Sequence, residues 1–196
     1  MIAVVKYNAG NVFSVDCALQ RIGVDAKITD DFDTLRGADK VIFPGVGEAS
    51  TAMNYLREKG LDALIKNLTQ PVLGICVGLQ LLCRHSEEGN ADCLGVFDAD
   101  VKRFENLSVP ELKIPHMGWN TIKIEKDSFI PKDLDGKFVY YVHSFYAETS
   151  PDTVATTDYI LPFSAALQKD NFYATQFHPE KSGDVGEQIL KHFIEL

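Results

Sequence analysis

The strongest constraint on the fold is the alternation of short apolar runs with helix-patterned segments in the first half of the chain. The runs IAVVKY (2–7), KVIFPGVG (40–47) and PVLGI (71–75) are rich in β-branched residues, and segments with helical spacing of apolar residues separate them. Strands that alternate with helices form parallel sheets, because each connection crosses back over a face of the sheet. The pattern predicts an α/β fold with a mostly parallel central sheet and helices on both faces.

The helices of this half can be placed from their apolar spacing and their ends. In the segment 10–23, apolar residues recur at helical spacing, at Val12, Val15, Leu19 and Ile22. Asn11 is a candidate N-cap, and Gly23 fits the left-handed position that ends a helix. Further helices are predicted at EASTAMNYLREKG (48–60), LDALIKNL (61–68) and VGLQLLCRH (77–85), with a strand at DAKIT (25–29).

After about residue 93 the pattern changes to strand-like pieces separated by turn residues. A final helix is predicted over 183–196, where Val185, Ile189 and Phe193 share one face. We therefore expect an antiparallel, strand-rich second half. No internal repeat or linker divides the chain, so one domain comprising residues 1–196 is expected.

Composition excludes several classes of function. Apolar residues make up 45% of the 196, which is enough for a core without metals or disulfides. With 19 basic and 28 acidic residues the net charge is −9, which argues against binding to nucleic acid or to an anionic membrane. No run of 18 apolar residues or secretory leader is present, so a cytoplasmic protein is expected. Four cysteines without a CxxC pair suggest neither a disulfide framework nor a zinc site.

The stretch GICVGLQLL (74–82) places Cys76 between two glycines where a buried strand turns into a helix. Most buried cysteines only fill space in the core. A strand followed by Gly-x-Cys-x-Gly and a helix is, however, the pattern of a nucleophile elbow, in which Gly74 and Gly78 let the backbone pass close by. The helix N-terminus also favours the reactive thiolate. Cys76 is therefore a candidate nucleophile.

A thiolate nucleophile needs a base and a group that orients the base. His178 stands in QFHPEKS at the end of a strand-like run, and Pro179 holds it in an extended conformation. Glu180 can then orient the same imidazole, as in other Cys-His-acid sites. On its own, such a His-Pro-Glu stretch is more often a capped turn than a catalytic pair.

The turn FPGVG (43–47) supplies a third component. Acyl transfer needs N–H donors directed at the oxyanion of the tetrahedral intermediate. The backbone of Val46 and Gly47 can supply one donor and Val77 another, although Pro-Gly-x-Gly is also an ordinary turn.

The motifs PGVG, GICVGLQLL and HPE, in this order and at these separations, resemble the class I (triad) glutamine amidotransferases over essentially the whole chain. The resemblance implies that family's three-layer α/β fold and a Cys76, His178 and Glu180 triad. It implies hydrolysis of L-glutamine through a γ-glutamyl thioester, with ammonia as the useful product and with no metal or organic cofactor. Positions that the resemblance assigns to glutamine contact are Gly47, Gln80, Glu88, Ser144 and Phe145; for Glu88 an exposed loop remains an alternative.

Two further stretches narrow the resemblance. YNAGNVFSV (7–15) and KIPHMGWN (113–120) are similar to segments of the amidotransferase subunits of imidazole glycerol phosphate synthase. In that family HMGWN lies on the face that docks onto the cyclase, a TIM barrel. A lone tryptophan is usually a core residue, but the match favours an interface. Asn8 and Ala9 stand in a loop usually richer in glycine. The interface residues that the resemblance implies are Asn11, Met117, Trp119, Asn120 and Lys181.

The implied reaction makes imidazole glycerol phosphate and AICAR from glutamine and PRFAR, a step of histidine biosynthesis. Three alternatives remain open. The glutaminase subunit of pyridoxal phosphate synthase shares fold, triad and size, although HMGWN speaks against it. A stand-alone Cys-His peptidase or γ-glutamyl hydrolase would act without a partner. A pseudo-amidotransferase would only bind a synthase, which the intact triad disfavours.

Overall fold

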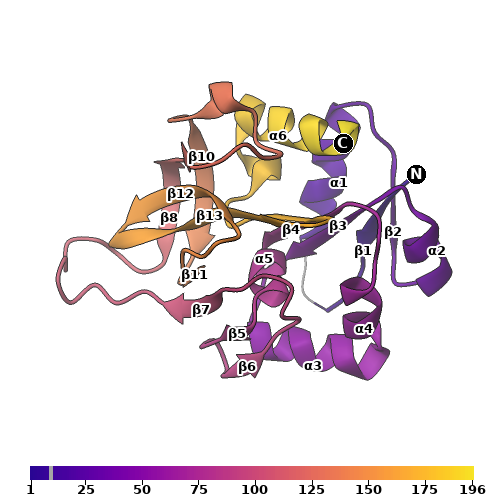
Figure 1. The fold of residues 1–196 in the computed structure, drawn as a ribbon, viewed down its shortest axis with the longest axis horizontal. Helices are drawn as coiled ribbons and strands as arrows, with labels where there is room; N and C mark the ends of the chain where they lie inside the picture. The colour runs from indigo at the N-terminus through magenta and orange to yellow at the C-terminus, as the bar shows by residue number, and fades with distance from the viewer. Residues whose placement is uncertain (9–10) are drawn as a thin grey trace.

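The computed structural model describes residues 1–8 and 11–196, so Ala9 of the N-terminal loop lies outside the described residues. The central sheet contains eight strands in the order β2-β1-β3-β4-β14-β13-β12-β9 (Figure 1). Neighbouring strands from β2 to β14 run parallel, and those from β14 to β9 run antiparallel. The strands of this sheet are β1 (Ile2–Val5), β2 (Ala26–Thr29), β3 (Lys40–Gly45), β4 (Val72–Cys76), β9 (Lys123–Ile124), β12 (Thr153–Tyr159), β13 (Leu161–Lys169) and β14 (Phe172–Thr175).

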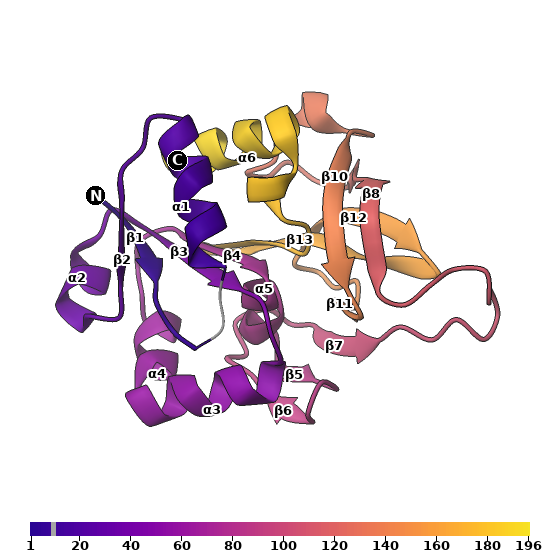
Figure 2. The same cartoon turned by 180° about the vertical axis from the view of Figure 1, so that it is seen from behind.

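Helices cover both faces of the sheet, as the alternating pattern predicts. Figures 1 and 2 show α1 (Val12–Arg21) and α6 (Gly183–Glu195) on one face. On the other face lie α3 (Ala49–Lys59), α4 (Leu61–Lys66) and α5 (Val77–Leu82). Within the described ranges, no helix is both long enough and apolar enough to cross a membrane. The predicted three-layer α/β fold is confirmed.

The chain between His85 and Ala147 adds two small sheets at one side of the central sheet. One pairs β10 (Phe138–His143) with β8 (His116–Thr121) in antiparallel register. The other has the order β11-β7-β5-β6. Its strands are β5 (His85–Ser86), β6 (Ala91–Asp92), β7 (Asp100–Arg103) and β11 (Phe145–Ala147). Single turns of 3₁₀ helix form at Lys132–Leu134 and Pro179–Lys181.

The ends of the helices follow local hydrogen-bonding chemistry. Asn11 caps α1, because its Oδ1 accepts a hydrogen bond of 3.3 Å from the Ser14 N–H, and Gly23 has φ of +77°. The predicted helices over 61–68 and 77–85 end earlier, at Lys66 and Leu82. The second ends early because the chain from Cys83 is extended and enters β5.

A short helix was not expected between β2 and β3. The helix α2 (Phe32–Gly37) begins after Asp31, whose side chain accepts a hydrogen bond of 2.8 Å from the Thr34 N–H. It buries only Leu35 fully, so no repeating apolar pattern marks it in the sequence. The sequence feature that could have indicated this helix is Asp31, a residue type that commonly caps helix N-termini.

The position of β14 determines where the site forms. This strand comes late in the chain but lies between β4 and β13, with Thr175 opposite Ile75. The residues that follow β4 and β14 therefore leave the sheet at the same edge. Ligands of open α/β sheets bind outside the carboxyl ends of such parallel strands.

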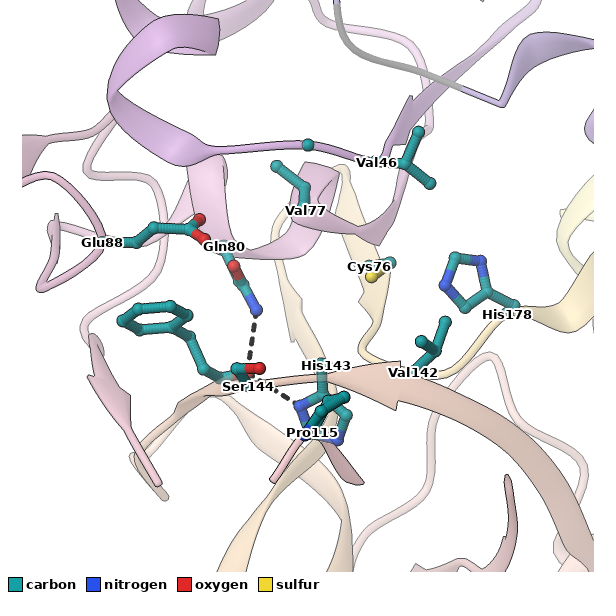
Figure 3. A pocket seen from close by; sticks show the side chains of 12 residues that line it. Val46, Cys76, Val77, Gln80, Glu88, Pro115, Val142, His143, Ser144 and His178 are labelled. Carbon is teal, nitrogen blue, oxygen red and sulfur yellow. Dashed lines mark hydrogen bonds between the residues drawn. The ribbon is translucent and has the colours of Figure 1, made fainter. Parts of the chain in front are cut away.

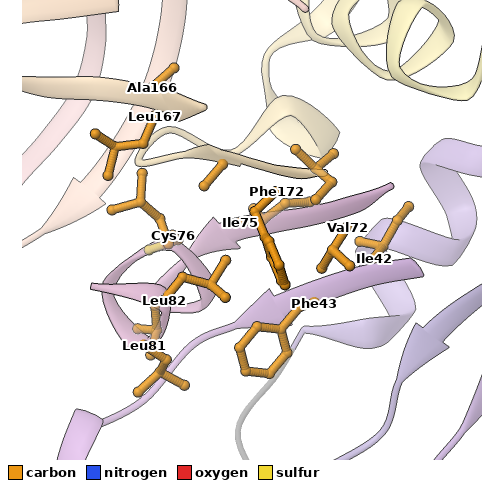
Figure 4. Close-up of a cluster of buried hydrophobic side chains, with 14 of the residues drawn as sticks. Ile42, Phe43, Val72, Ile75, Cys76, Leu81, Leu82, Ala166, Leu167 and Phe172 are labelled. Atoms are coloured by element: carbon orange, nitrogen blue, oxygen red, sulfur yellow. The ribbon is translucent and has the colours of Figure 1, made fainter. Parts of the chain in front are cut away.

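The core beneath this edge is closely packed around α5. Figure 4 shows Phe43 of β3, Ile75 of β4 and Leu82 of α5 among the buried side chains of this region. A Cβ atom built on Gly78 would overlap the carbonyl oxygen of Phe43, and one on Gly74 would lie 2.8 Å from Leu82 Cδ1. Both glycines are thus needed for α5 to reach the sheet.

We expect Gly78→Ala to destabilise the protein by about 3 kcal/mol, because α5 must move away from the Phe43 carbonyl. Thermal unfolding should show Tm lowered by about 10 °C. The matched control is Gly37→Ala at the end of α2, where nothing in the described part of the chain lies within 4 Å of the added carbon. Equal unfolding temperatures for the two variants would contradict the packing argument.

Candidate active site

Cys76 lies at the junction of β4 and α5 in a strained backbone conformation, with φ of +54° and ψ of −108°. A positive φ is uncommon for a residue with a side chain, and such strain concentrates at functional sites. The turn directs the side chain to the carboxyl edge of the sheet, where it lines a cavity. The geometry is that of a nucleophile elbow.

His178 reaches the same cavity from the end of β14. Its Nδ1 forms a hydrogen bond of 2.8 Å with Glu180 Oε1, and both side chains are almost fully buried. Its Nε2 is buried without a hydrogen-bond partner among the described residues, and Figure 3 shows the imidazole beside the Cys76 sulfur. The arrangement is that of a nucleophile, a base and an orienting carboxylate.

Strand β10 fixes the position of His178. The His178 N–H donates to the Tyr140 carbonyl at 3.0 Å. The Ser182 hydroxyl donates to the His178 carbonyl at 2.7 Å and accepts from the Tyr140 N–H at 2.9 Å. The backbone of one β10 residue therefore holds both sides of the turn that carries the imidazole.

The cavity has a volume of about 360 Å³ and opens beside Cys76 (Figure 3). The structure brings together there all the residues that the sequence assigned to glutamine and oxyanion contacts. The lining residues are Val46, Gly47, Cys76, Val77, Gln80, Glu88, Pro115, Val142, His143, Ser144, Phe145 and His178.

Glu88 supplies the carboxylate of this cavity. Its Oε2 accepts a hydrogen bond of 2.9 Å from the Ala49 N–H at the start of α3. Burial raises the pKa of Glu88, and the negative charge of nearby Glu48 adds to the rise. Glu48 in turn caps α3, and hydrogen bonds from Ser50 and Thr51 lower its pKa to about 2. Glu88 is half-buried rather than part of an open exposed loop, and it suits an ammonium group.

Gln80, which lines the cavity, is hydrogen-bonded to the buried Gln176. The Gln80 amide nitrogen donates to the Phe145 carbonyl and to Gln176 Oε1, both at 3.0 Å. The Gln176 amide nitrogen donates to the Cys76 sulfur at 3.7 Å. Sequence reasoning missed Gln176 and the lining residues Pro115 and Val142, and it expected only backbone contacts from the segment HSF (143–145) that contains His143. Gln176 stands two positions before His178 in QFHPEKS, but nothing in its local spacing indicates a contact with Cys76.

A family model for class-I glutamine amidotransferases matches residues 4–196. The chain belongs to the class-I glutamine amidotransferase family. A crystal structure of a glutamine amidotransferase that is 20% identical superposes on this amidotransferase with a TM-score of 0.75, over 99% of this chain and 97% of the other. At that identity the likeness concerns the fold alone.

Relatives that match over the full length show which amidotransferases of the family this chain is similar to. The imidazole glycerol phosphate synthase subunit HisH of Bacteroides fragilis strain YCH46 is 63% identical to it over 195 residues, which cover 100% of this chain and 99% of the relative. The HisH subunit of Escherichia coli strain K12 is 44% identical over 197 residues, with 100% and 99% covered. The amidotransferase is thus similar over its full length to synthase subunits.

The residues assigned to an interface lie on β8, in the turn after His178 and at the start of α1. On β8, Met117 and Trp119 are 63% and 56% exposed, so the single tryptophan is a surface residue. Lys181 is exposed beside the His178 turn. Asn11 and Asn120 are half-buried, and each uses its side chain within the chain: Asn11 caps α1, and Asn120 donates to the Asp158 carbonyl at 3.0 Å. Among the described residues, no group of histidine, cysteine and acidic side chains is arranged to hold a metal ion.

The charge state of His178 in the amidotransferase gives a prediction. Burial alone would lower the pKa of His178, but the thiolate charge of Cys76 and the hydrogen bond with Glu180 raise it to about 10. The pKa of His178 in the folded protein thus exceeds its ordinary value of 6.5. The interactions of protonated His178 with Cys76 and Glu180 therefore stabilise the folded protein fully below pH 6.5, and this stabilisation is lost as the pH rises through about 10.

NMR titration of the His178 ring should therefore show an imidazolium at pH 8 in the wild type. Cys76→Ala removes the thiolate charge and should lower the His178 pKa, since burial then acts with less compensation. Titration of His178 at the same pH in both proteins would disprove the charge coupling.

Proposed function

We propose that this chain is the glutaminase subunit of imidazole glycerol phosphate synthase, acting in the cytoplasm as one domain of residues 1–196. It hydrolyses L-glutamine and passes the ammonia to a TIM-barrel cyclase subunit. The observation that carries the proposal is the buried His178–Glu180 pair beside Cys76, in a cavity that also holds the Glu88 carboxylate. The full-length similarity to HisH subunits supports the choice of synthase.

The cavity suits glutamine at both of its ends. Glu88 offers a carboxylate to the α-ammonium group of the substrate. Gln80 uses both amide hydrogens within the protein, which leaves its carbonyl oxygen to accept from the substrate. Ser144, Phe145 and Gly47 also line the cavity and offer backbone contacts to the substrate. Bound in this way, the substrate's side-chain amide lies at Cys76.

The reaction begins when the Cys76 thiolate, whose proton is held by the His178 imidazolium, attacks the amide carbon. The carbonyl oxygen becomes an oxyanion, which the N–H groups of Val77 and of the Val46–Gly47 turn stabilise. Glu180 holds the imidazole in orientation and stabilises its positive charge.

The tetrahedral intermediate collapses when His178 gives its proton to the leaving nitrogen. The C–N bond breaks, ammonia leaves and a γ-glutamyl thioester on Cys76 remains. Water then attacks the thioester with His178 as the base, which releases glutamate and restores the thiol. Overall, glutamine and water give glutamate and ammonia.

The ammonia is used on the partner subunit. There it would convert PRFAR into imidazole glycerol phosphate and AICAR in histidine biosynthesis. The exposed apolar side chains of Met117 and Trp119 support docking of that partner on β8, since exposed aromatic residues and methionine are enriched in protein interfaces.

Glutamate formation by the purified chain with the cyclase and PRFAR tests the function. In this assay His178→Ala is expected to reduce kcat by about 10⁴-fold or more, because the thiol loses its proton acceptor. Glu180→Gln is expected to reduce it less, since the imidazole still reaches the thiol part of the time. Negligible and equal effects of the two substitutions would contradict the assigned roles. A wild-type complex without glutaminase activity would rule out the function itself.

A further inference from the structure

Two buried histidines beside the cavity take no part in the chemistry described above. His116 Nδ1 and His143 Nε2 form a hydrogen bond of 2.9 Å, and the two residues are 4% and 6% exposed. The His116 ring stacks between Tyr141 and Tyr159, with centroid distances of 4.7 and 3.9 Å. A polar pair enclosed in this way must satisfy its hydrogen bonds internally.

The direction of the hydrogen bonds is fixed from both ends. At the cavity end, the Phe145 carbonyl can only accept, so His143 Nδ1, at 2.7 Å, carries a hydrogen. At the other end, the Thr121 N–H can only donate, and it donates to Asn120 Oδ1 at 2.8 Å. The Asn120 amide nitrogen therefore faces His116 Nε2, at 3.3 Å, and donates to it.

Only one protonation pattern satisfies all of these bonds. His116 accepts at Nε2 and donates from Nδ1, and His143 accepts at Nε2 and donates from Nδ1. Both rings are then neutral, because a second proton on either ring would place two N–H groups face to face. Burial acts in the same direction, as it lowers the pKa of His116 to about 4 and that of His143 to about 3.

The hydrogen bonds continue from Phe145 to the nucleophile. The Phe145 carbonyl also accepts from Gln80, as the dashed lines in Figure 3 show together with the His143 bond. Gln80 donates to Gln176, and Gln176 donates to the Cys76 sulfur. An unbroken run of hydrogen bonds thus connects strand β8 with the thiol.

We propose that His116, His143 and Gln176 are positioning residues in a hydrogen-bond relay between Asn120 and Cys76, in which the Phe145 carbonyl accepts from His143 on one side and from Gln80 on the other. The proposal rests on the glutaminase function. The relay holds the Phe145 carbonyl, which orients the Gln80 amide so that its oxygen faces the substrate. Gln176 holds the sulfur atom. Asn120 starts the relay on the strand that carries Trp119, so the docking face and the glutamine cavity share one hydrogen-bonded structure.

The first test measures tautomers in the free chain, without any reaction. Nitrogen-15 NMR at pH 7 should show His116 and His143 both as neutral Nδ1–H rings. Asn120→Asp replaces the donating amide by an accepting carboxylate of the same shape, so His116 must gain a proton on Nε2. The signals of both rings should change. An Nε2–H tautomer or an imidazolium at either ring in the wild type would overturn the relay.

The second test measures glutamine kinetics in the complex with cyclase and PRFAR, at saturating cyclase. Asn120→Asp and His116→Phe, which keeps the aromatic stack, should each raise KM for glutamine about tenfold, with a smaller change in kcat, because a buried polar group loses its partner. The matched control for His116→Phe is His192→Phe, at a histidine of α6 outside the cavity and the relay, which should leave KM unchanged.

The two proposals fail in different ways in this experiment. An unchanged KM in both relay variants, with an active wild type, would overturn the relay and leave the glutaminase function standing. An inactive wild type would overturn the function instead, while the NMR result would still describe the histidines.

Discussion

Cys76→Ser is expected to abolish glutamine hydrolysis while leaving synthesis from external ammonia intact. The serine hydroxyl is a far weaker nucleophile than the thiolate that His178 generates. Removal of the nucleophile from a catalytic triad costs on the order of 10⁶ in kcat, and we expect a loss of that order. The cyclase reaction takes place on another polypeptide and needs only ammonia, so ammonium salts should restore product formation.

The measurement is glutamate release and product formation in the same complex, with glutamine or ammonium chloride as nitrogen source. Cys17→Ser is the matched control, because Cys17 is a half-buried free thiol on α1. A glutamine-like electrophile should label Cys76 and leave the other three thiols, at Cys17, Cys83 and Cys93, unmodified. Normal glutamine turnover in Cys76→Ser would remove Cys76 from the mechanism.

Glutaminase activity of the isolated chain is expected to rise at least about a hundredfold when both the cyclase and PRFAR bind. Ammonia released without an acceptor is lost. Low glutaminase activity in the absence of the cyclase therefore avoids wasteful hydrolysis of glutamine. The switch we propose is the peptide between Gly45 and Val46, which can present a carbonyl or an N–H to the oxyanion. Loss of one oxyanion donor costs about 10²–10³ in rate, which matches the expected activation.

The backbone around this peptide limits where a flip can occur. The Tyr7 hydroxyl donates to the Pro44 carbonyl at 2.7 Å and so holds the preceding peptide. Gly45 is closely packed, since a Cβ there would lie 2.6 Å from the Gly78 nitrogen. On the other side, Gly47 has φ of +116° and tolerates conformations that other residues do not. Rotation of this peptide changes ψ of Gly45 and φ of Val46, so Gly45, which carries no Cβ, gives the peptide its freedom to flip, and Gly47 lets the chain after Val46 adjust.

Docking of a partner on β8 can affect the position of His178 through contacts with β10. Trp119 is the cross-strand neighbour of Tyr140, and their rings lie 5.9 Å apart. The Tyr140 backbone holds His178 and Ser182. We expect Trp119→Ala to weaken the match between glutamate formed and product formed, and to leave the triad competent. Rates of both products, measured with and without cyclase and PRFAR, test this. Full glutaminase activity in the free chain, unchanged by a partner, would favour a stand-alone hydrolase.

Individual helices were predictable from the sequence, because apolar spacing and capping residues lie within or next to each helix. Apolar spacing located α1 and α3, and Asn11 and Gly23 marked the two ends of α1. The order of strands in the sheet was not predictable in the same way. The insertion of β14 between β4 and β13 depends on pairing between residues about 100 positions apart, and no local spacing encodes it.

The residues of the site likewise fall into those that local motifs indicate and those that depend on contacts between distant strands. Cys76, His178 and Glu180 were located because each stands in a short motif whose backbone geometry is characteristic. The relay residues His116 and His143 were missed, although both lie in segments that the sequence reasoning singled out. Their role depends on a contact across the β8–β10 pair, where the two residues are direct neighbours. A single sequence gives the composition of each strand but not its register with another.

The central place of β14 also has a consequence for biosynthesis on the ribosome. Chains are synthesised from the N-terminus, and domains generally fold as units. Here the Cys76 elbow is synthesised well before its base, because His178 follows a strand, β14, that must be inserted beside β4. A partly synthesised chain therefore carries a thiol without its proton acceptor. The growing polypeptide therefore cannot hydrolyse glutamine before His178 has been added and β14 has paired with β4.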